Sequence, residues 1–172
     1  SYNNGNILNF YNFSNTGQLL WSKAYWVRSQ GHKLAVDSLG NIYVTCLRLD
    51  GGVAMSVDMA VLKMDATGNV LWHKSYGGTY GELPRDIVIA SDGNPVICGV
   101  TNSDGNGGDD AFLLKIDGGG SVQWCRTYGT VWTDVPASVH QTADEGFILA
   151  GVTYAYGTNT DSLKMHVIRT DS

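Results

Sequence analysis

The stretch DATGNVLWHKSYGG, residues 65–78, decides the fold because the chain repeats it. Residues 117–130 read DGGGSVQWCRTYGT and keep Gly, Val, Trp, a basic residue, Tyr and Gly in the same places. A third copy surrounds Trp21, so that Trp21, Trp72 and Trp124 are 51 (72 − 21) and 52 (124 − 72) residues apart. Self-similarity at a fixed period of about 20 to 50 residues indicates a repeat architecture.

Two further phrases follow the same period. One set comprises LGNIYVTC (39–46), DGNPVICG (92–99) and DEGFILAG (144–151). The other comprises ILNFYNFS (7–14), DMAVLKMD (58–65), DAFLLKID (110–117) and KMHVIRTD (164–171). Each unit then holds four short strands, and a period of about 40 to 50 residues with four strands is typical of a β-propeller blade.

The sequence therefore predicts an all-β chain that forms part of a β-propeller. We expect one propeller segment over residues 1–172, with blades at about 7–51, 58–103 and 110–157 and one extra strand at 163–170. The composition agrees, because 22 Gly, nine Tyr and five Trp accompany short runs of Val, Ile and Thr. No long amphipathic segment with caps at both ends predicts a helix.

LAVDSLGNIYVTC (34–46) and DAFLLKIDGGGSVQWCRTYGT (110–130) resemble the bacterial β-propeller repeat family that is often described as seven-bladed. The resemblance covers nearly the whole chain. It implies a propeller fold in a secreted or cell-surface protein, and hence an extracellular or cell-surface location. The family supplies no catalytic motif.

Charge and hydropathy exclude two classes of partner. The chain has 16 acidic and 11 basic residues, and these are scattered, so the basic patch that nucleic-acid binding needs is missing. No apolar run approaches the roughly 20 residues of a membrane-spanning helix, so we expect no membrane insertion.

The repeated Trp phrase is interpreted as packing chemistry. Side chains alternate between the faces of a strand, which places Val70, Trp72, Lys74 and Tyr76 on one face. A large indole at the same place in every unit suits sheet-on-sheet packing, with the basic side chain lying along the ring. The Asp residues that precede the phrase, such as Asp65, are expected to form turns.

Long, dissimilar loops should emerge together at the end opposite the short turns, because strands in a blade alternate in direction. Loops on a rigid scaffold commonly carry function. The candidate recognition residues in these loops are Trp26, Arg28, Tyr80, Glu82, Trp132, Asp134, Tyr154 and Tyr156. Their alternative role is to cap the edges of the blades.

The loop TNSDGNGGDD, residues 101–110, invites a metal interpretation. Asp104, Asn106, Asp109 and Asp110 offer oxygen ligands that suit calcium. An ordinary solvated loop is the alternative, because the spacing departs from the EF-hand template. Calcium is the only cofactor that the residues suggest for a binding module.

Two functions of different classes remain. The first is a non-enzymatic binding or scaffold module that recognises protein or glycan through the long loops. The second is a quinoprotein-like dehydrogenase, because MDATGNVLW (64–72) resembles the Trp-docking phrase of the PQQ dehydrogenases, Ala-x-Asp-x-x-Thr-Gly-x-x-x-Trp. The phrase departs from that pattern, since one residue, Ala66, separates Asp65 from Thr67.

Three blades and one strand do not close a ring of the usual four to eight blades. We therefore expect further blades of a longer chain, or a homo-oligomer, to complete the propeller.

Overall fold

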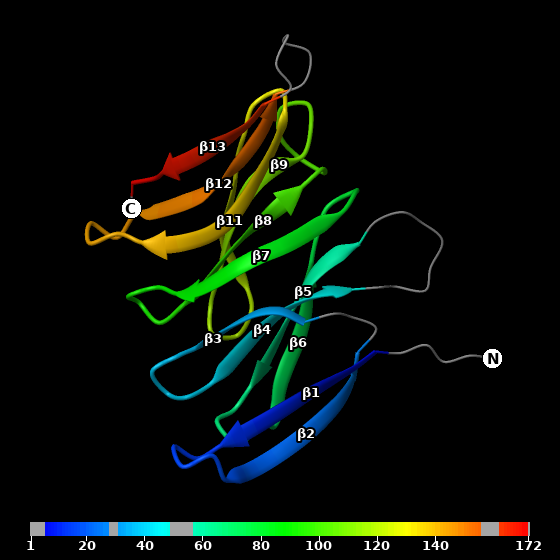
Figure 1. The fold of residues 1–172 in the computed structure, drawn as a ribbon, viewed down its shortest axis with the longest axis vertical. Helices are drawn as coiled ribbons and strands as arrows, with labels where there is room; N and C mark the ends of the chain where they lie inside the picture. The colour runs from blue at the N-terminus through cyan, green and yellow to red at the C-terminus, as the bar shows by residue number, and fades with distance from the viewer. Residues whose placement is uncertain (1–5, 28–30, 49–56, 156–161, 172) are drawn as a thin grey trace, which may run out of the picture.

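The computed structural model describes residues 6–27, 31–48, 57–155 and 162–171. These residues form antiparallel β-sheets and no helix, which confirms the all-β prediction (Figure 1). The four sheets follow one another along the long axis of the molecule, from the N-terminal pair of strands to the C-terminal sheet.

Each sheet consists of strands that are consecutive in the chain. The first sheet contains β1 (Asn6–Phe13) and β2 (Leu19–Val27). The second contains β3 (Gly31–Val36), β4 (Ile42–Arg48), β5 (Asp58–Met64) and β6 (Val70–Tyr76). The third contains β7 (Glu82–Ile89), β8 (Pro95–Thr101), β9 (Asp110–Ile116) and β10 (Val122–Tyr128). The fourth contains β11 (Thr133–Gln141), β12 (Phe147–Ala155) and β13 (Ser162–Arg169).

The sheets begin two strands away from the expected units 7–51, 58–103 and 110–157. The four-stranded sheets start at β3 and β7, so the Trp-containing strands β6 and β10 are the last strands of their sheets. By the same pattern β1 and β2 correspond to β5 and β6. The strand expected as an extra at 163–170 is β13, the third strand of the last sheet.

The turn at residues 65–69 shows why the repeated phrase starts with Asp. Asp65 Oδ1 accepts hydrogen bonds from the backbone N–H groups of Thr67 and Asn69 at 2.9 and 2.8 Å. Gly68 closes the turn with a positive φ of 79°, which favours glycine. The hydrogen bonds from Asn69 and Thr67 lower the pKa of Asp65 to about 2.

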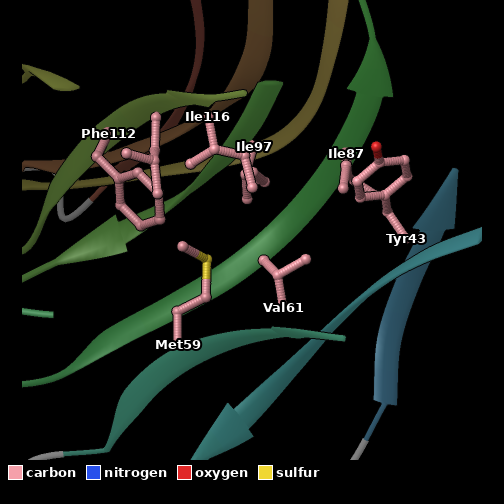
Figure 2. Close-up of a cluster of buried hydrophobic side chains, with 8 residues drawn as sticks. Tyr43, Met59, Val61, Ile87, Ile97, Phe112 and Ile116 are labelled. Atoms are coloured by element: carbon pink, nitrogen blue, oxygen red, sulfur yellow. The ribbon is translucent and has the colours of Figure 1, made fainter. Parts of the chain in front are cut away.

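The main core lies between the second and third sheets. Figure 2 shows side chains of β4 and β5 pointing towards side chains of β7, β8 and β9. Its buried members are Tyr43, Met59, Val61, Ile87, Ile97, Phe112, Leu114 and Ile116. Each large aliphatic side chain that is fully buried here stabilises the fold by about 1.5 to 3 kcal/mol.

The Trp phrase joins each sheet to the next one. Trp72 Nε1 donates a hydrogen bond of 3.1 Å to the carbonyl oxygen of Gly118, which lies in the turn between β9 and β10. Lys74 Nζ lies 5.9 Å from the centroid of the Trp72 ring. One junction earlier, Tyr25 Oη donates to the carbonyl oxygen of Gly68. The structure thus places these side chains at the packing contact that the sequence predicted.

Candidate functional site

The two ends of the sheets differ in their connections. Five-residue turns join β3 to β4, β5 to β6, β7 to β8, β9 to β10 and β11 to β12. The opposite end carries connections whose lengths vary, which include the described loops 77–81, 102–109 and 129–132. We call the described loops at this end, together with the adjoining strand ends, the long-loop surface.

Glu82, a predicted recognition residue, is buried at the start of β7 with 8% of its surface exposed. Its Oε2 accepts a hydrogen bond of 2.9 Å from the backbone N–H of Gly78. Its Oε1 lies 3.0 Å from the Thr101 hydroxyl, which donates to it. The carboxylate therefore holds the 77–81 loop against the end of β8.

Asp134 has the equivalent place at the start of β11 and is fully buried. Its Oδ2 accepts hydrogen bonds from the backbone N–H and the hydroxyl of Thr130, at 2.6 and 2.9 Å. Its Oδ1 lies 3.1 Å from Nδ1 of His166 on β13. The structure thus assigns Asp134, like Glu82, to fixing the loop that precedes its strand.

Asp110 is the one predicted metal ligand that is fully buried. Its Oδ2 accepts a 2.7 Å hydrogen bond from the backbone N–H of Asn106, and its carboxylate packs closely against Gly105 and Gly129. Burial raises the pKa of Asp110, and the negative charges of Asp134 and Asp109 add to this rise. This carboxylate is thus already engaged in loop structure.

The other predicted calcium ligands lie along the same loop. Asp104 and Asn106 are exposed, and Asp109 is half-buried. In the described part of the chain, no group of three or more His, Cys, Asp or Glu side chains is arranged to hold a metal ion. Calcium binding by this loop stays a prediction.

The described loops at this end contact one another in series. Gly81 N–H donates to Asn102 Oδ1 at 2.7 Å, and Tyr80 N–H donates to Ser103 Oγ at 2.9 Å. These bonds tie loop 77–81 to loop 102–109. Loop 102–109 also packs closely against loop 129–132, because a Cβ placed on Gly108 would lie only 2.9 Å from the backbone carbonyl carbon of Trp132. The long-loop surface is therefore continuous from loop 77–81 to loop 129–132.

Apolar and aromatic side chains are displayed on this surface. Tyr80 is 56% exposed, Val131 is 68% exposed and Tyr154 is 38% exposed, while Trp132 is half-buried. Tyr154 pairs with Thr133 in the β11–β12 ladder, and Thr133 directly follows Trp132 in the chain. The sequence reasoning missed Val131, although its apolar side chain directly precedes Trp132 in a loop.

Of the three other predicted residues, the structure places only Trp26, and that only in part. Trp26 lies in β2, where its backbone pairs with that of Ile7, but its side chain lies outside the described residues. Arg28 and Tyr156 also lie outside the described residues.

A cavity of about 370 Å³ lies between β6 and β10 at the same end of the sheets. Its apolar wall includes Met59, Phe112 and Leu114, and its polar rim includes Glu82 and Cys125. A cavity of this size can admit a small organic group. Because Gly77 and Gly78 also line it, the cavity adjoins the 77–81 loop.

The phrase that resembles the PQQ-docking motif has its polar atoms engaged within the fold. Asp65 accepts hydrogen bonds from Thr67 and Asn69, including one from the Thr67 hydroxyl at 2.8 Å. The indole N–H of Trp72 is bonded to Gly118. These residues therefore serve the turn and the junction between sheets.

Comparisons with known proteins give few relatives. No protein-family model matches the chain. The regulatory protein FlaEY of Caulobacter vibrioides is 27% identical over 119 residues, which are 62% of this chain and 12% of that protein. The chain thus spans about an eighth of the length of that relative.

One solved structure, a protein of unknown function from Bacteroides caccae, aligns with 92% of this chain and 66% of its own. The TM-score is 0.49 and the sequence identity is 10%.

Among the described residues, no helix has the length and apolar character needed to cross a membrane.

Proposed function

We propose that the chain is a non-enzymatic binding or scaffold module of the β-propeller type, which recognises a protein or a glycan through the long-loop surface. The observation that carries the proposal is the continuity of this surface, on which Tyr80, Val131 and Trp132 lie on loops tied to one another. Aromatic side chains are enriched where proteins bind partners, because they bury a large area with few rotatable bonds.

Buried acids support the same proposal. Glu82 and Asp134 each accept a hydrogen bond from the backbone of the loop before them, which limits the motion of loops 77–81 and 129–132. A surface that is already ordered loses less conformational entropy when it binds. The loops thus combine varied sequence with a fixed shape, as a recognition surface requires.

The propeller form rests on the sequence period and on four-stranded sheets that follow one another with short turns at one end. We propose that further sheets, from additional sequence or from other copies, complete the ring, and that the protein acts outside the cell or on its surface. The match to a protein named as regulatory is in keeping with an activity exerted by binding.

A binding screen with matched variants tests the proposal. Glycan arrays and immobilised candidate proteins are probed with the wild type and with Tyr80→Ala, Trp132→Ala and Leu39→Ala. Leu39 is 82% exposed in the turn after β3, at the opposite end of the sheets, and serves as the control. We expect a ligand whose affinity falls about tenfold or more in the Trp132 variant and is unchanged in the Leu39 variant.

Equal binding by all four proteins would remove the long-loop surface from the proposed site. The enzyme alternative is tested by titrating PQQ with calcium while recording the absorbance spectrum, followed by a dye-linked alcohol oxidation assay. Saturable PQQ binding with turnover would contradict the non-enzymatic proposal.

A further inference from the structure

The cavity of about 370 Å³ between β6 and β10 has walls from two sheets. Met59 on β5 pairs with Tyr76 on β6, and both side chains line the cavity from the second sheet. Leu114 on β9 pairs with Cys125 on β10, and both line it from the third sheet. Every residue that lines the cavity lies between Met59 and Thr127, in the longest continuous part of the chain that the structure describes.

The inner part of this cavity is apolar. Met59, Phe112 and Leu114 are buried, and Figure 2 shows Met59 and Phe112 pointing towards each other from β5 and β9. Cys125 and Thr127 on β10 also line the cavity and are exposed, so the cavity opens to solvent along this strand. A ligand that enters can therefore place an apolar group against buried side chains.

Carboxylates gather at the end of the cavity nearest loop 77–81. Glu82 and Asp104 both line the cavity, Glu82 as a buried residue and Asp104 as an exposed one. A third carboxylate lies beside Glu82, because Asp58 Oδ1 and Glu82 Oε2 would each be 2.6 Å from a Cβ placed on Gly77. This end of the cavity therefore concentrates negative charge.

No basic side chain neutralises these carboxylates within the part of the chain that the structure describes. The ion pairs found there are formed by other acidic residues. Glu82 accepts its hydrogen bonds from two uncharged donors, the Gly78 N–H and the Thr101 hydroxyl. Because acidic side chains are almost never buried unless they are paired, a cation bound in the cavity would complete the surroundings of Glu82.

Aromatic rings narrow the chemistry of the ligand further. Tyr76 and Phe112 line the cavity from its two walls. Aromatic rings stack on flat apolar groups, and their faces attract cations. The cavity volume of about 370 Å³ is near the lower end of the range for ligand sites, so the ligand should be small.

We propose that this cavity binds a small organic cation, an ammonium group joined to an apolar and preferably aromatic body. The ammonium group lies near Glu82 and Asp104, and the apolar body packs against Met59, Phe112 and Leu114. The ligand is a free small molecule. The inference is independent of the proposed recognition of protein or glycan, although the cavity opens beside the long-loop surface.

Phenethylamine provides the probe, and three related compounds isolate its parts. Phenethyl alcohol has the same body without the charge, hydrocinnamate carries a negative charge instead, and ethylamine keeps the ammonium group without the ring. Isothermal titration calorimetry with the full 172-residue chain at pH 7 measures each affinity. We expect saturable binding of phenethylamine that is about tenfold or more tighter than that of each related compound.

Substitutions that neutralise single carboxylates locate the ammonium group. Glu82→Gln should weaken phenethylamine binding about tenfold or more, because a buried charge pair is lost. Asp104→Asn should weaken it about threefold, because this carboxylate is exposed and its ion pair is screened by water. Asp144→Asn removes the same charge from an exposed position in the turn between β11 and β12, so it should leave binding unchanged. Asp104→Asn still decides the outcome if Glu82→Gln disturbs the loop that Glu82 holds.

Cys125 reports whether the cavity is occupied, because it lines the cavity and is exposed. Saturating phenethylamine should slow the modification of Cys125 by an uncharged thiol reagent about fivefold or more, since the bound amine covers the thiol. Hydrocinnamate at the same concentration should leave the rate unchanged. Mass spectrometry of the labelled peptides measures both rates.

The absence of saturable phenethylamine binding, equal binding of phenethyl alcohol, or an affinity unchanged by Glu82→Gln and Asp104→Asn would overturn the proposal. Modification of Cys125 at an unchanged rate under saturating amine would also overturn it, because the amine would then bind elsewhere. Tyr80→Ala and Trp132→Ala, which test the long-loop surface, should leave amine binding unchanged. The two proposals can therefore fail separately.

Discussion

Tyr76 Oη donates a 2.8 Å hydrogen bond to the carbonyl oxygen of Gly120, and this bond joins the last strand of the second sheet to the last turn of the third. The two residues are 44 positions apart in the chain. A Cβ on Gly120 would lie 3.0 Å from the Tyr76 hydroxyl oxygen, so the close approach depends on glycine. Contacts of this kind hold consecutive sheets together.

Tyr76→Phe should lower the free energy of unfolding by about 1 kcal/mol, the usual net contribution of one hydrogen bond. For a chain of this length such a loss lowers Tm by about 2 to 4 °C. Thermal unfolding followed by circular dichroism at pH 7 measures the change. An unaltered Tm would show that water replaces the Tyr76 hydroxyl as the donor to the Gly120 carbonyl without cost.

The same substitution should also change how stability depends on pH. Burial, with a smaller effect from the charge of Asp117, raises the pKa of Tyr76 to about 12. Folding thus favours the neutral phenol. The stability that the neutral phenol contributes is complete below the unfolded-state pKa of about 10 and is lost as the pH rises towards 12. Denaturant unfolding from pH 9 to pH 12 should show a steeper loss of stability in the wild type than in Tyr76→Phe.

Asp110→Asn should stabilise the fold at neutral pH. Burial raises the pKa of Asp110, so the ionised carboxylate lowers the free energy of unfolding at a pH above the folded-state pKa. This loss of stability disappears at a pH below the unfolded-state pKa of about 4, where the carboxyl group is protonated in both states. Asn keeps an oxygen that can accept the hydrogen bond from Asn106. Urea unfolding should therefore show a more stable variant at pH 7 and nearly equal proteins at pH 3.

Asp65→Asn is the matched control, because the turn lowers the pKa of Asp65 to about 2. The ionised Asp65 favours folding above its unfolded-state pKa, so this variant should be less stable than the wild type at pH 7. Shifts of the same sign in both variants would contradict the assigned environments. A calcium-dependent rise in Tm that only Asp110→Asn abolishes would instead support a metal at Asp110.

The packing role of the Trp strands and the turn role of Asp65 could be predicted because their chemistry is local and repeated. The start of each sheet could not be predicted. The connection 77–81, which passes from one sheet to the next, has the same five-residue length as the turn 65–69 within a sheet. Loop length therefore did not show where the chain changes sheets.

The structural role of the buried carboxylates could have been inferred from the sequence. Glu82 lies six positions after Tyr76, and Asp134 lies six positions after Tyr128. This repetition indicates a structural role, by the same logic that applied to the Trp residues. Tyr80 and Trp132 also repeat, each four positions after its Tyr, but Tyr80 is 56% exposed and Trp132 is half-buried, so accessibility and not a lack of repetition carries the proposed recognition.

The thiols should differ sharply in reactivity. Cys98 is fully buried, and burial raises its pKa to about 12, whereas Cys125 is exposed on β10. Because the thiolate is the reactive form, a disulfide-exchange reagent at pH 8 should modify Cys125 in the native protein and Cys98 only after unfolding. Mass spectrometry of the labelled peptides identifies the sites, and rapid native labelling of Cys98 would contradict its burial.

Glu145→Gly should stabilise the protein through the backbone alone. Glu145 has a φ of 67° in the turn between β11 and β12, where the equivalent turns place Gly40 and Gly93 at 80° and 81°. A side chain in this left-handed region costs about 1 kcal/mol, so glycine should raise the free energy of unfolding by up to that amount. Gly93→Ala is the reverse change, and a Cβ there meets nothing within 4 Å, so strain in φ alone should lower stability. Chemical denaturation should show that the free energy of unfolding rises in Glu145→Gly and falls in Gly93→Ala. A destabilised Glu145→Gly protein would show that the Glu145 side chain makes a contact that outweighs the strain.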